Sequence, residues 1–476
     1  MSSMIYVRRE VGSLGPGDKT LSAYSDAVKA MHSRPASDPT SWAFQAAMHG
    51  TLASNPLPGQ NQCQHATWFF ACWHRMFLYC FERIVRAAVI EAGGPRDWAL
   101  PYWNYELGGA AAAIPPAFRP ATAGGRHNPL YVSQRAPGIN SGHALPSAAT
   151  TSRHAISRPA FVGAAEFGGG RTQVLFQHFN GPTGQLEATP HNAVHGVVGG
   201  QAGWMNDPDQ AAQDPIFWLH HSNIDRLWAL WIRDGHTNPS VPQWANQSFS
   251  FFDEHGAKIS FTAAKVLDTV TDLSYTYDQF VNAPPPRTPA ADSGSGRTES
   301  AARMSESLSR EPELVAGLAA PLQLSGQPEQ VQLELNQRAA TDALATLSTT
   351  TPRILLEIQD INAERHPGTV YGVYVNLPAD APPDQEPDHH VGNLSFFGVE
   401  RARDPGGDQQ PHGLSLTFDI TQLAESERAA GHWDDQAITV SFKPLGLIPP
   451  EGEEPAGPGA EPEPPATIGS ISIYYA

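Results

Sequence analysis

The sequence predicts a mainly α domain, with a helical core and long loops, followed by an all-β, sandwich-like domain. Apolar residues recur at helical spacing within residues 41–92 and 214–235. After residue 312 the apolar period changes to two, which is typical of half-buried strands. The intervening residues 284–312 are rich in Pro, Ser and Gly and offer little that a core could bury. We therefore expect domains at residues 1–283 and 313–476, joined by a flexible linker.

Composition limits the partners of the chain. Its 476 residues include 30 Lys and Arg against 48 Asp and Glu, which gives a net charge of −18. Nucleic acids and anionic membranes attract basic clusters, so neither is an expected partner. No window approaches the ~20 apolar residues of a membrane helix, and the first residues lack a Sec signal. We expect a cytoplasmic protein, with export by another route and association into a homo-oligomer both left open.

Four segments of the first domain are expected to be helical: residues 41–52, 65–92, 189–200 and 214–235. The third opens after Pro190 and is short. The fourth has Asp214 as its N-cap, Pro215 at its first position and Gly235 just past its end. Residues 108–190, rich in small residues and proline, predict long loops over the helical core.

The second domain shows apolar alternation in seven short segments. Such a set predicts a β-sandwich. The expected strands are residues 330–336, 353–361, 369–377, 393–399, 414–420, 437–443 and 468–476. The acidic, Pro-rich stretch 449–466 is expected to be a loop.

One group of histidines lies on the later helices. His191 and His195 are four residues apart, so on a helix they share one face. The residues between them are Asn, Ala and Val, so the glutamate of the zinc-protease motif is missing. His221 lies on the following apolar helix, and three imidazoles can therefore converge on one metal.

A second group also contains three histidines, His49, His65 and His74. His65 and His74 are nine residues apart, which places them on opposite faces of one uninterrupted helix. If both bind one metal, His65 must therefore precede the helix and only His74 can lie on it. Two sites of three neutral imidazoles, without an obvious cysteine or carboxylate ligand, suit copper. The residues themselves thus predict two copper ions that bind dioxygen between them.

Two long segments resemble the copper signatures of tyrosinases and polyphenol oxidases. "HATWFFACWHRMFLYCFERIV" is similar to the first, and "PHNAVHGVVGG" with "DPIFWLHHSNIDRLWALW" is similar to the second. The resemblance covers roughly residues 1–283. It implies two copper ions, the first bound by His49, His65 and His74, and the second by His191, His195 and His221. His220 would then be a non-ligating neighbour of the pocket.

Further residues take roles from the same resemblance. Cys63 stands two residues before His65, where fungal tyrosinases and molluscan haemocyanins form a thioether to the histidine. The alternative is a small buried residue, which we expect for Cys72 and Cys80. Asp225 either supports His221 and its helix or forms a surface salt bridge.

Tyr275 and Tyr277 resemble the Tyr-x-Tyr element that closes the copper domain of the plant enzymes. In that family an N-terminal arginine packs on these tyrosines, and Arg8 or Arg9 could fill that role.

The implied activity is oxidation of phenols by dioxygen: ortho-hydroxylation of monophenols and conversion of o-diphenols to o-quinones. In the family, residues matching Glu187 and Asn192 hold a water that acts as base, although Glu187 could instead be an exposed loop carboxylate. The pair favours a tyrosinase over a catechol oxidase or an o-aminophenol oxidase. An oxygen carrier like haemocyanin is the rival of another class. Gly196 and Pro208 lack bulky side chains, which predicts an open pocket.

The second domain resembles the C-terminal domain of latent polyphenol oxidases, through "GVYVNLP", "LTFDITQL" and "IGSISIYYA". The resemblance implies a lid over the copper cleft, and the alternative is a structural or oligomerisation module. Loop 382–392, with the pair His389 and His390, is the candidate for the segment inserted at the site. The alternative for this loop is a solvated surface segment.

Overall fold

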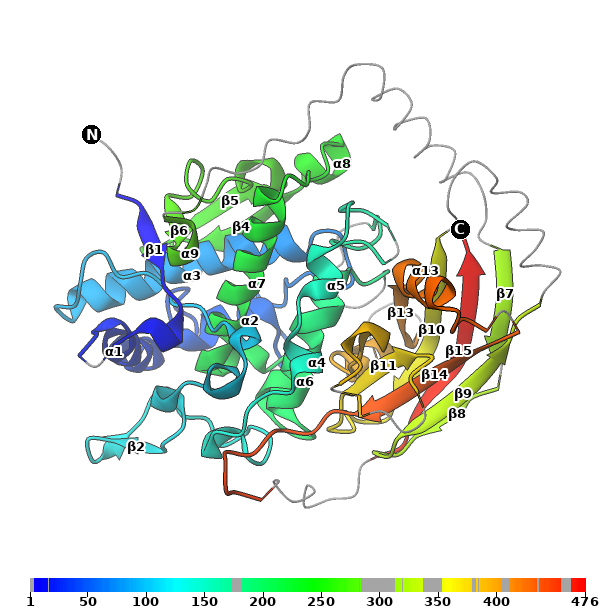
Figure 1. Cartoon of the computed structure of the whole chain (residues 1–476). Helices are drawn as coiled ribbons and strands as arrows, with labels where there is room; N and C mark the ends of the chain where they lie inside the picture. The colour runs from blue at the N-terminus through cyan, green and yellow to red at the C-terminus, as the bar shows by residue number, and fades with distance from the viewer. Residues whose placement is uncertain are drawn as a thin grey trace.

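The computed structural model places a helical part and a β part side by side (Figure 1). The expected linker 284–312 lies outside the residues that the structure describes. Those are residues 4–15, 17–163, 165–172, 181–281, 283, 313–318, 320–336, 353–378, 382–383, 385–404, 411–434, 436–454 and 464–476.

The helical part is built on four longer helices and one short one. They are α1 (Thr20–His32), α2 (Trp42–His49), α3 (Phe70–Glu91), α6 (Ala193–Gly199) and α7 (Pro215–Arg233). Asp214 caps α7 by accepting a hydrogen bond from the Ile216 backbone N–H at 3.0 Å, which stabilises such a helix by about 1 kcal/mol. Because α3 begins at Phe70, His65 precedes this helix and His74 lies on it, as the spacing predicts.

Shorter elements complete this part. The short helices are α4 (Ser147–Thr150), α5 (Arg153–Ile156), α8 (Pro242–Ala245) and α9 (Asp278–Val281). A π-helical turn, Glu187–Asn192, runs directly into α6. Single 3-10 turns cover Val11–Ser13, Tyr105–Leu107, Gly109–Ala112, Pro116–Phe118, Ile139–Ser141, Trp204–Asn206, Ala211–Gln213 and Ala263–Lys265.

The strands of the helical part form small two-stranded sheets. The pairs are β1 (Tyr6–Arg8) with β6 (Tyr275–Tyr277), β2 (Thr122–Ala123) with β3 (Arg126–His127), and β4 (Ser248–Phe252) with β5 (Lys258–Thr262). β1 and β6 pair in parallel, with Arg8 opposite Tyr277. The parallel pair therefore brings the start of the chain beside the Tyr-x-Tyr element. No helix among the described residues has the length and apolar character that a membrane crossing requires.

The β part consists of two antiparallel sheets. In one, the order is β13 (Leu414–Asp419), β10 (Ile354–Ala363), β15 (Ala466–Tyr475) and β7 (Glu313–Leu318), with β8 (Leu322–Leu324) also on β15. In the other, the order is β12 (His390–Leu394), β11 (Tyr371–Val375), β14 (Ala437–Pro444) and β9 (Glu329–Glu334). Buried residues alternate along β13 and β15, as the period of two predicts.

Three details of the β part differ from the sequence prediction. The predicted strand 393–399 is wrong beyond Leu394, because a turn and the short helix α12 (Val399–Arg403) follow. The domain is also not all-β, since α13 (Thr421–Ala430) fills the segment after β13. The sequence does carry a signal for α13, namely helix-forming residues followed by Gly431, which adopts the left-handed conformation at the C-cap. The short edge strands β7 and β8 were missed, because they offer few alternating positions.

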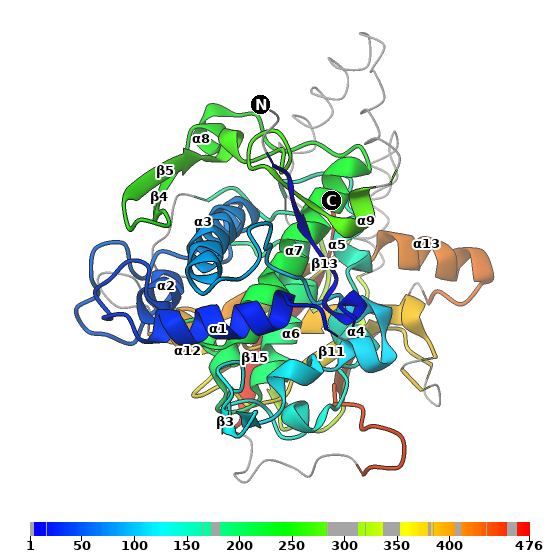
Figure 2. The same ribbon diagram turned by 90° about the vertical axis from the view of Figure 1, so that its left-hand side faces the viewer.

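The two parts meet where the π-helical turn before α6 contacts β12 and where Gly196 of α6 lies against Val370 and Ser395. Figure 2 views the molecule from the helical side, with the β part behind the helices. A second contact lies at the opposite edge. After β14 the chain returns to the helical part, where Ile448 and Ala144 exchange two backbone hydrogen bonds of 2.7 and 2.9 Å. A segment that follows the last-but-one strand of the β part therefore also holds this part on the helical part.

Candidate metal centre

His49, His65 and His74, here called the first trio, converge in the core. His49 ends α2, His65 lies in the loop before α3, and His74 lies on α3. Their ring centroids are 5.1 to 5.6 Å apart, and all three side chains are buried. Three separate elements therefore deliver one imidazole each to the same point.

His191, His195 and His221, the second trio, converge beside the first. Their ring centroids are 4.5 to 5.4 Å apart. The Nε2 atom of His221 lies 3.3 Å from Nε2 of His191 and 3.2 Å from Nε2 of His195. The His221 ring also stacks on His74 of the first trio, with centroids 4.6 Å apart. The structure thus brings all six predicted ligands into one centre.

Backbone carbonyls fix the tautomers of His49 and His74 in the first trio. Nδ1 of His49 donates to the Pro208 carbonyl at 2.8 Å, and Nδ1 of His74 donates to the Phe70 carbonyl at 2.9 Å. A neutral imidazole that donates from Nδ1 keeps a lone pair on Nε2, which is the form that binds a metal. Nε2 of His49 is buried and has no hydrogen-bond partner among the described residues. A metal ion at that atom would satisfy it.

Two members of the second trio, His191 and His195, are also fixed through Nδ1. Nδ1 of His195 donates to the Met205 carbonyl at 2.6 Å, and Nδ1 of His191 donates to Oδ1 of Asn192 at 2.8 Å. Two Nε2 lone pairs therefore face His221, which can donate one proton to only one of them. A cation between the three nitrogens removes this conflict. The donor set fits copper, because buried imidazoles and the Cys63 thiol, and no carboxylate, make up the groups that could hold a metal among the described residues.

Burial keeps these histidines neutral. It lowers the pKa of His49 to about 4 and the pKa values of His191, His195 and His221 well below their ordinary range. Ligand histidines must be deprotonated to bind a metal. The site is therefore already in its ligating form at neutral pH.

His220 lies in the same cluster and faces a different group. Its Nδ1 atom is 3.2 Å from the Tyr105 hydroxyl, and its ring stacks on His191 with centroids 5.4 Å apart. One nitrogen of His220 still falls within 4.8 Å of a nitrogen of each member of the second trio. Distance alone therefore does not separate His220 from the ligands, and the contact with Tyr105 favours a supporting role.

Glu187 is buried beside the first trio. The backbone N–H of Ala66, the residue after His65, donates to both carboxylate oxygens at 2.8 and 3.0 Å. Burial raises the pKa of Glu187 to about 8, although the Ala66 hydrogen bond opposes this rise. The alternative of an exposed loop carboxylate is therefore wrong. Glu187 and Asn192 are the first and last residues of the π-helical turn that carries His191.

The three cysteines are all buried, and Cys63 lies beside a predicted ligand. Its sulfur is 3.6 Å from Nδ1 of His65. Cys72 donates to the Phe69 carbonyl at 3.3 Å within α3, and Cys80 is enclosed by the core. Only the Cys63 sulfur therefore has the position that a thioether to His65 requires.

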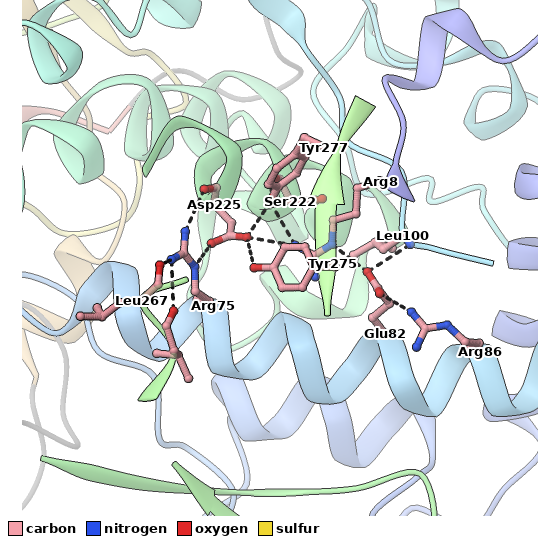
Figure 3. Close-up of polar contacts among 11 residues, drawn as sticks. Arg8, Arg75, Glu82, Arg86, Leu100, Ser222, Asp225, Leu267, Tyr275 and Tyr277 are labelled. Atoms are coloured by element: carbon pink, nitrogen blue, oxygen red, sulfur yellow. Dashed lines mark hydrogen bonds and ion pairs between the residues drawn. The ribbon is translucent and has the colours of Figure 1, made fainter. Parts of the chain in front are cut away.

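Asp225, one turn beyond His221 on α7, is the centre of a buried ion network (Figure 3). One carboxylate oxygen accepts from Arg8 at 3.0 Å and from the hydroxyls of Tyr275 and Tyr277 at 2.5 Å each. The other accepts from Arg75 at 2.5 Å. The surface salt bridge considered for Asp225 is therefore wrong. Because Arg75 follows His74, the network ties the two ligand-bearing helices together.

The predicted N-terminal arginine is Arg8. Its guanidinium lies 3.8 Å from the centre of the Tyr275 ring, and Nε donates to Glu82 of α3 at 2.7 Å. Arg9 pairs instead with Asp18 at 2.7 Å in a partly exposed position. The sequence analysis missed Glu82 and Arg75 as members. Their seven-residue spacing places them on one face of α3 and was the available signal.

A turn of the β part covers the metal centre. Phe397, between β12 and α12, stacks on His195 with ring centroids 4.3 Å apart, and its ring lies 5.4 Å from His65 and 5.6 Å from His191. The expectation that loop 382–392 inserts at the site is wrong for its described residues. There, His390 contacts His154 at 3.2 Å and His389 donates to the Val375 carbonyl at 2.9 Å.

The pocket expected around Gly196 is closed in the intact chain. A Cβ atom at Gly196 would lie 2.6 Å from a methyl group of Val370 and 3.1 Å from the hydroxyl of Ser395. Ser395 also donates to the Asn192 carbonyl at 2.8 Å. Pro208 is buried, and its carbonyl orients His49, so it is not an open rim. The prediction of an open pocket is thus wrong for this form of the chain, because the β part packs directly on α6.

Comparisons with known proteins agree with this geometry. Residues 39–234 match the common central domain of tyrosinase, residues 239–287 the polyphenol oxidase middle domain, and residues 311–476 a domain of unknown function. The chain is 33% identical over 468 residues to a tyrosinase from Hahella sp. (strain CCB-MM4), covering 90% of this chain and 93% of that protein. It is 29% identical to a chloroplastic polyphenol oxidase of Spinacia oleracea over 57% of this chain and 47% of that protein, about half the plant protein's length.

Solved structures show the same fold. A latent apple tyrosinase aligns with a TM-score of 0.65 at 21% identity, over 100% of this chain and 98% of that chain. A recombinant latent aurone synthase aligns with a TM-score of 0.63 at 21% identity, over 100% and 90%. Both carry a helical part and a β part, as does this chain.

Proposed function

Because the chain belongs to the tyrosinase and polyphenol oxidase family of type 3 dinuclear copper proteins, we propose that it is a tyrosinase with both activities. It would hydroxylate monophenols at the ortho position and oxidise o-diphenols to o-quinones, with dioxygen as the oxidant. The family itself supports a copper oxidase of phenols. We assign the first copper to His49, His65 and His74, and the second to His191, His195 and His221. Bound copper would transfer electrons from the phenol to dioxygen and act as a Lewis acid toward the phenol oxygen.

Glu187 is the observation that carries the monophenol activity. A phenol has a pKa near ~10, so a base must accept its proton at neutral pH. Glu187 has a buried carboxylate beside His65, and its raised pKa of about 8 brings it toward that of the phenol. The positive charge of bound copper would favour the ionised carboxylate. Asn192 orients His191 from the other end of the same turn.

The test compares tyrosine with catechol after the two parts have been separated. We expect Glu187→Gln to lower tyrosine hydroxylation by roughly 10²-fold or more, the contribution of a general base, and catechol oxidation by less than tenfold. Glu91→Gln, at the exposed end of α3, is the matched control. If the parent protein oxidises catechol but not tyrosine, the function is that of a catechol oxidase. Reversible dioxygen binding without turnover would identify a carrier.

The β part is proposed to act as a lid that makes the intact chain latent. Phe397 occupies the space against His195 where a phenol ring would stack, and Ser395 and Val370 close the position above Gly196. A tethered lid competes with substrate at an effective concentration of the order of millimolar. Separation of the parts, in addition to linker cleavage, is therefore needed for full activity. A purely oligomeric role would leave catechol turnover unchanged after removal of residues 313–476.

We also propose that Cys63 and His65 are joined by a thioether in the copper-loaded protein. The sulfur lies 3.6 Å from Nδ1, which is bonded to the ring carbon that would form the thioether. The bond replaces one S–H and one ring C–H, and copper with dioxygen would accept the two hydrogens. Intact mass should therefore be lower than the sequence mass by two hydrogen atoms. Three reactive thiols in the denatured, copper-loaded protein would contradict this proposal.

A further inference from the structure

One loop orients a ligand from each half of the metal centre. This loop, residues 205–209, is here called the carbonyl loop. The Met205 carbonyl accepts from His195 at 2.6 Å, and the Pro208 carbonyl accepts from His49 at 2.8 Å. Asp209 adjoins Pro208, so displacement at this end of the loop would free the His49 ring, whereas Asn206 ties the Met205 end to the Gly200 carbonyl.

Asp209 fastens the carbonyl loop beside His49. Its backbone lies against Gly50, the residue after His49, where an added Cβ would be 2.8 Å from the Asp209 Cα atom and 2.4 Å from the Pro208 carbonyl oxygen. Its backbone N–H donates to Asp207 at 2.9 Å. Asp209 is only 7% exposed. Asp209 thus keeps the Pro208 carbonyl close to the His49 ring that donates to it.

The β part supplies the charge partner of Asp209. Arg401 of α12 places Nη2 2.7 Å from each carboxylate oxygen of Asp209 and 3.4 Å from the Thr51 carbonyl. Burial raises the pKa of Asp209 to about 6, and the hydrogen bond and charge of Arg401 oppose this rise. Arg401 stands four residues after Phe397. The same short segment therefore covers the metal centre through Phe397 and binds Asp209 of the carbonyl loop through Arg401.

We propose that Asp209 is a positioning residue for the first trio and that Arg401, from the C-terminal domain, completes it. In the intact chain the domain would then hold the first copper in place as well as cover it. Without Arg401, a buried carboxylate lacks its counter-charge and moves toward water, which draws Pro208 away from His49. His49 would then bind copper less firmly, while His74 and His191 keep partners outside the carbonyl loop.

The test measures copper release from the full chain. Copper-loaded parent, Asp209→Asn, Arg401→Gln and the charge-conserving Arg401→Lys are dialysed against a chelator, and copper per chain is followed with time. Arg403→Gln is the matched control, because Arg403 lies on the same helix and, among the described residues, its side chain donates to the Glu364 carbonyl of its own domain. We expect Asp209→Asn and Arg401→Gln to lose one of the two coppers at least tenfold faster. Arg401→Lys should stay nearer the parent rate, and Arg403→Gln should match it.

An electron paramagnetic resonance signal from the single remaining cupric ion should accompany this loss. The proposal is overturned if Asp209→Asn and Arg401→Gln release copper at the parent rate. It is also overturned if they lose both coppers together while the metal-free protein melts at a lower temperature, since that shows a general fold defect. An effect of Asp209→Asn alone would remove the C-terminal domain from the proposal. Copper release does not depend on monophenol hydroxylation, so failure of the Glu187 proposal would be seen separately.

Discussion

The metal centre has two walls that differ in how their charges are held. The inner wall, behind α3 and α7, contains Arg8, Arg75 and Asp225, whose side chains are 0%, 0% and 2% exposed. The outer wall comes from the C-terminal domain, and its Arg401 is 24% exposed. The attraction between buried paired charges is little affected by salt, whereas salt and solvent weaken the attraction between charges at a solvent-exposed edge. The comparison teaches that the charges of the inner wall are built to stay paired, whereas those of the outer wall can separate.

The walls also differ in what touches the histidines. The inner wall reaches them through the helices that carry them, because Arg75 is next to His74 and Asp225 is one turn from His221. The outer wall touches them through the ring of Phe397, and Ser395 donates to the carbonyl of Asn192, the residue after His191. A stacked aromatic contact contributes about 1 kcal/mol, whereas breaking a buried ion pair costs about 3–5 kcal/mol. Variants of the two walls should therefore fail in different ways.

The largest effect is expected at the centre, where the two neighbouring histidines of α7 can be compared. His221→Ala should lose the second copper and phenol oxidation, because two imidazoles alone remain for that ion. His220→Ala should keep both coppers, because His220 faces Tyr105. Metal analysis of the two purified variants is the measurement. Copper loss in His220→Ala and not in His221→Ala would reverse the assignment.

The inner wall is expected to be the more costly wall to break. Asp225→Ala leaves Arg8 and Arg75 buried without their shared carboxylate, which should lower the free energy of unfolding by about 3–5 kcal/mol. Asp234→Ala, at the exposed end of the same helix, is the control. Chemical denaturation of the metal-free proteins is the measurement. If both variants unfold at the same denaturant concentration, the inner wall does not have the proposed role.

The six histidines could be found from the sequence because their spacing carries geometric information. A separation of four residues places His191 and His195 on one face, and a separation of nine forces His65 off the helix of His74. These inferences depend only on local geometry, and the structure agrees with them. The network partner Glu82 lay within reach of the same reasoning, because it shares a helix face with Arg75.

Other features depend on contacts that no local pattern encodes. Phe397 stands in a segment that resembles an ordinary buried strand, and its contact with His195 joins two parts of the chain about two hundred residues apart. The burial of Glu187 depends on Ala66, from a distant loop. The two halves of the His154 and His390 pair are likewise distant in sequence. Such features are fixed by docking of the β part, which sequence periodicity does not describe.

Acid is expected to weaken the outer wall. His154 and His390 face each other across it at 3.2 Å, with Arg153 and Arg158 nearby. Burial lowers the pKa of His390 to about 4, and burial together with His390 lowers that of His154 well below its ordinary range. After separation both should titrate near their ordinary value of about 6.5. Docking is therefore at full strength above about pH 6.5 and is lost as pH falls toward 4.

Each proton taken up on separation changes the docking equilibrium by up to tenfold per pH unit. The measurement is catechol turnover by the intact chain from pH 7.5 down to 4.5, with the separated protein as reference. Burial raises the pKa values of the Asp209 and Glu166 carboxyls, so these two groups make docking stronger in acid. Variants are therefore needed to measure the contribution of the histidines separately. We expect His390→Gln to flatten the acid rise and His389→Gln to preserve it. Equal profiles for all three proteins would exclude the pair as the sensor.

The smallest effect is expected at Phe397. Phe397→Ala should raise catechol turnover of the intact chain at pH 7.5 by up to about tenfold, because about 1 kcal/mol of stacking on His195 is lost while the contacts at the edge of the outer wall remain. The same substitution in the separated protein should change nothing, since the side chain then no longer reaches the centre. Catechol turnover of the intact chain and of the separated protein tests directly whether the Phe397 side chain blocks the site. An equal change in both forms would mean that Phe397 acts through the fold of the C-terminal domain. If turnover of the intact chain is unchanged, the Phe397 ring is not the barrier to substrate. The charged contacts of the outer wall, such as that of Arg401 with Asp209, would then keep the site closed.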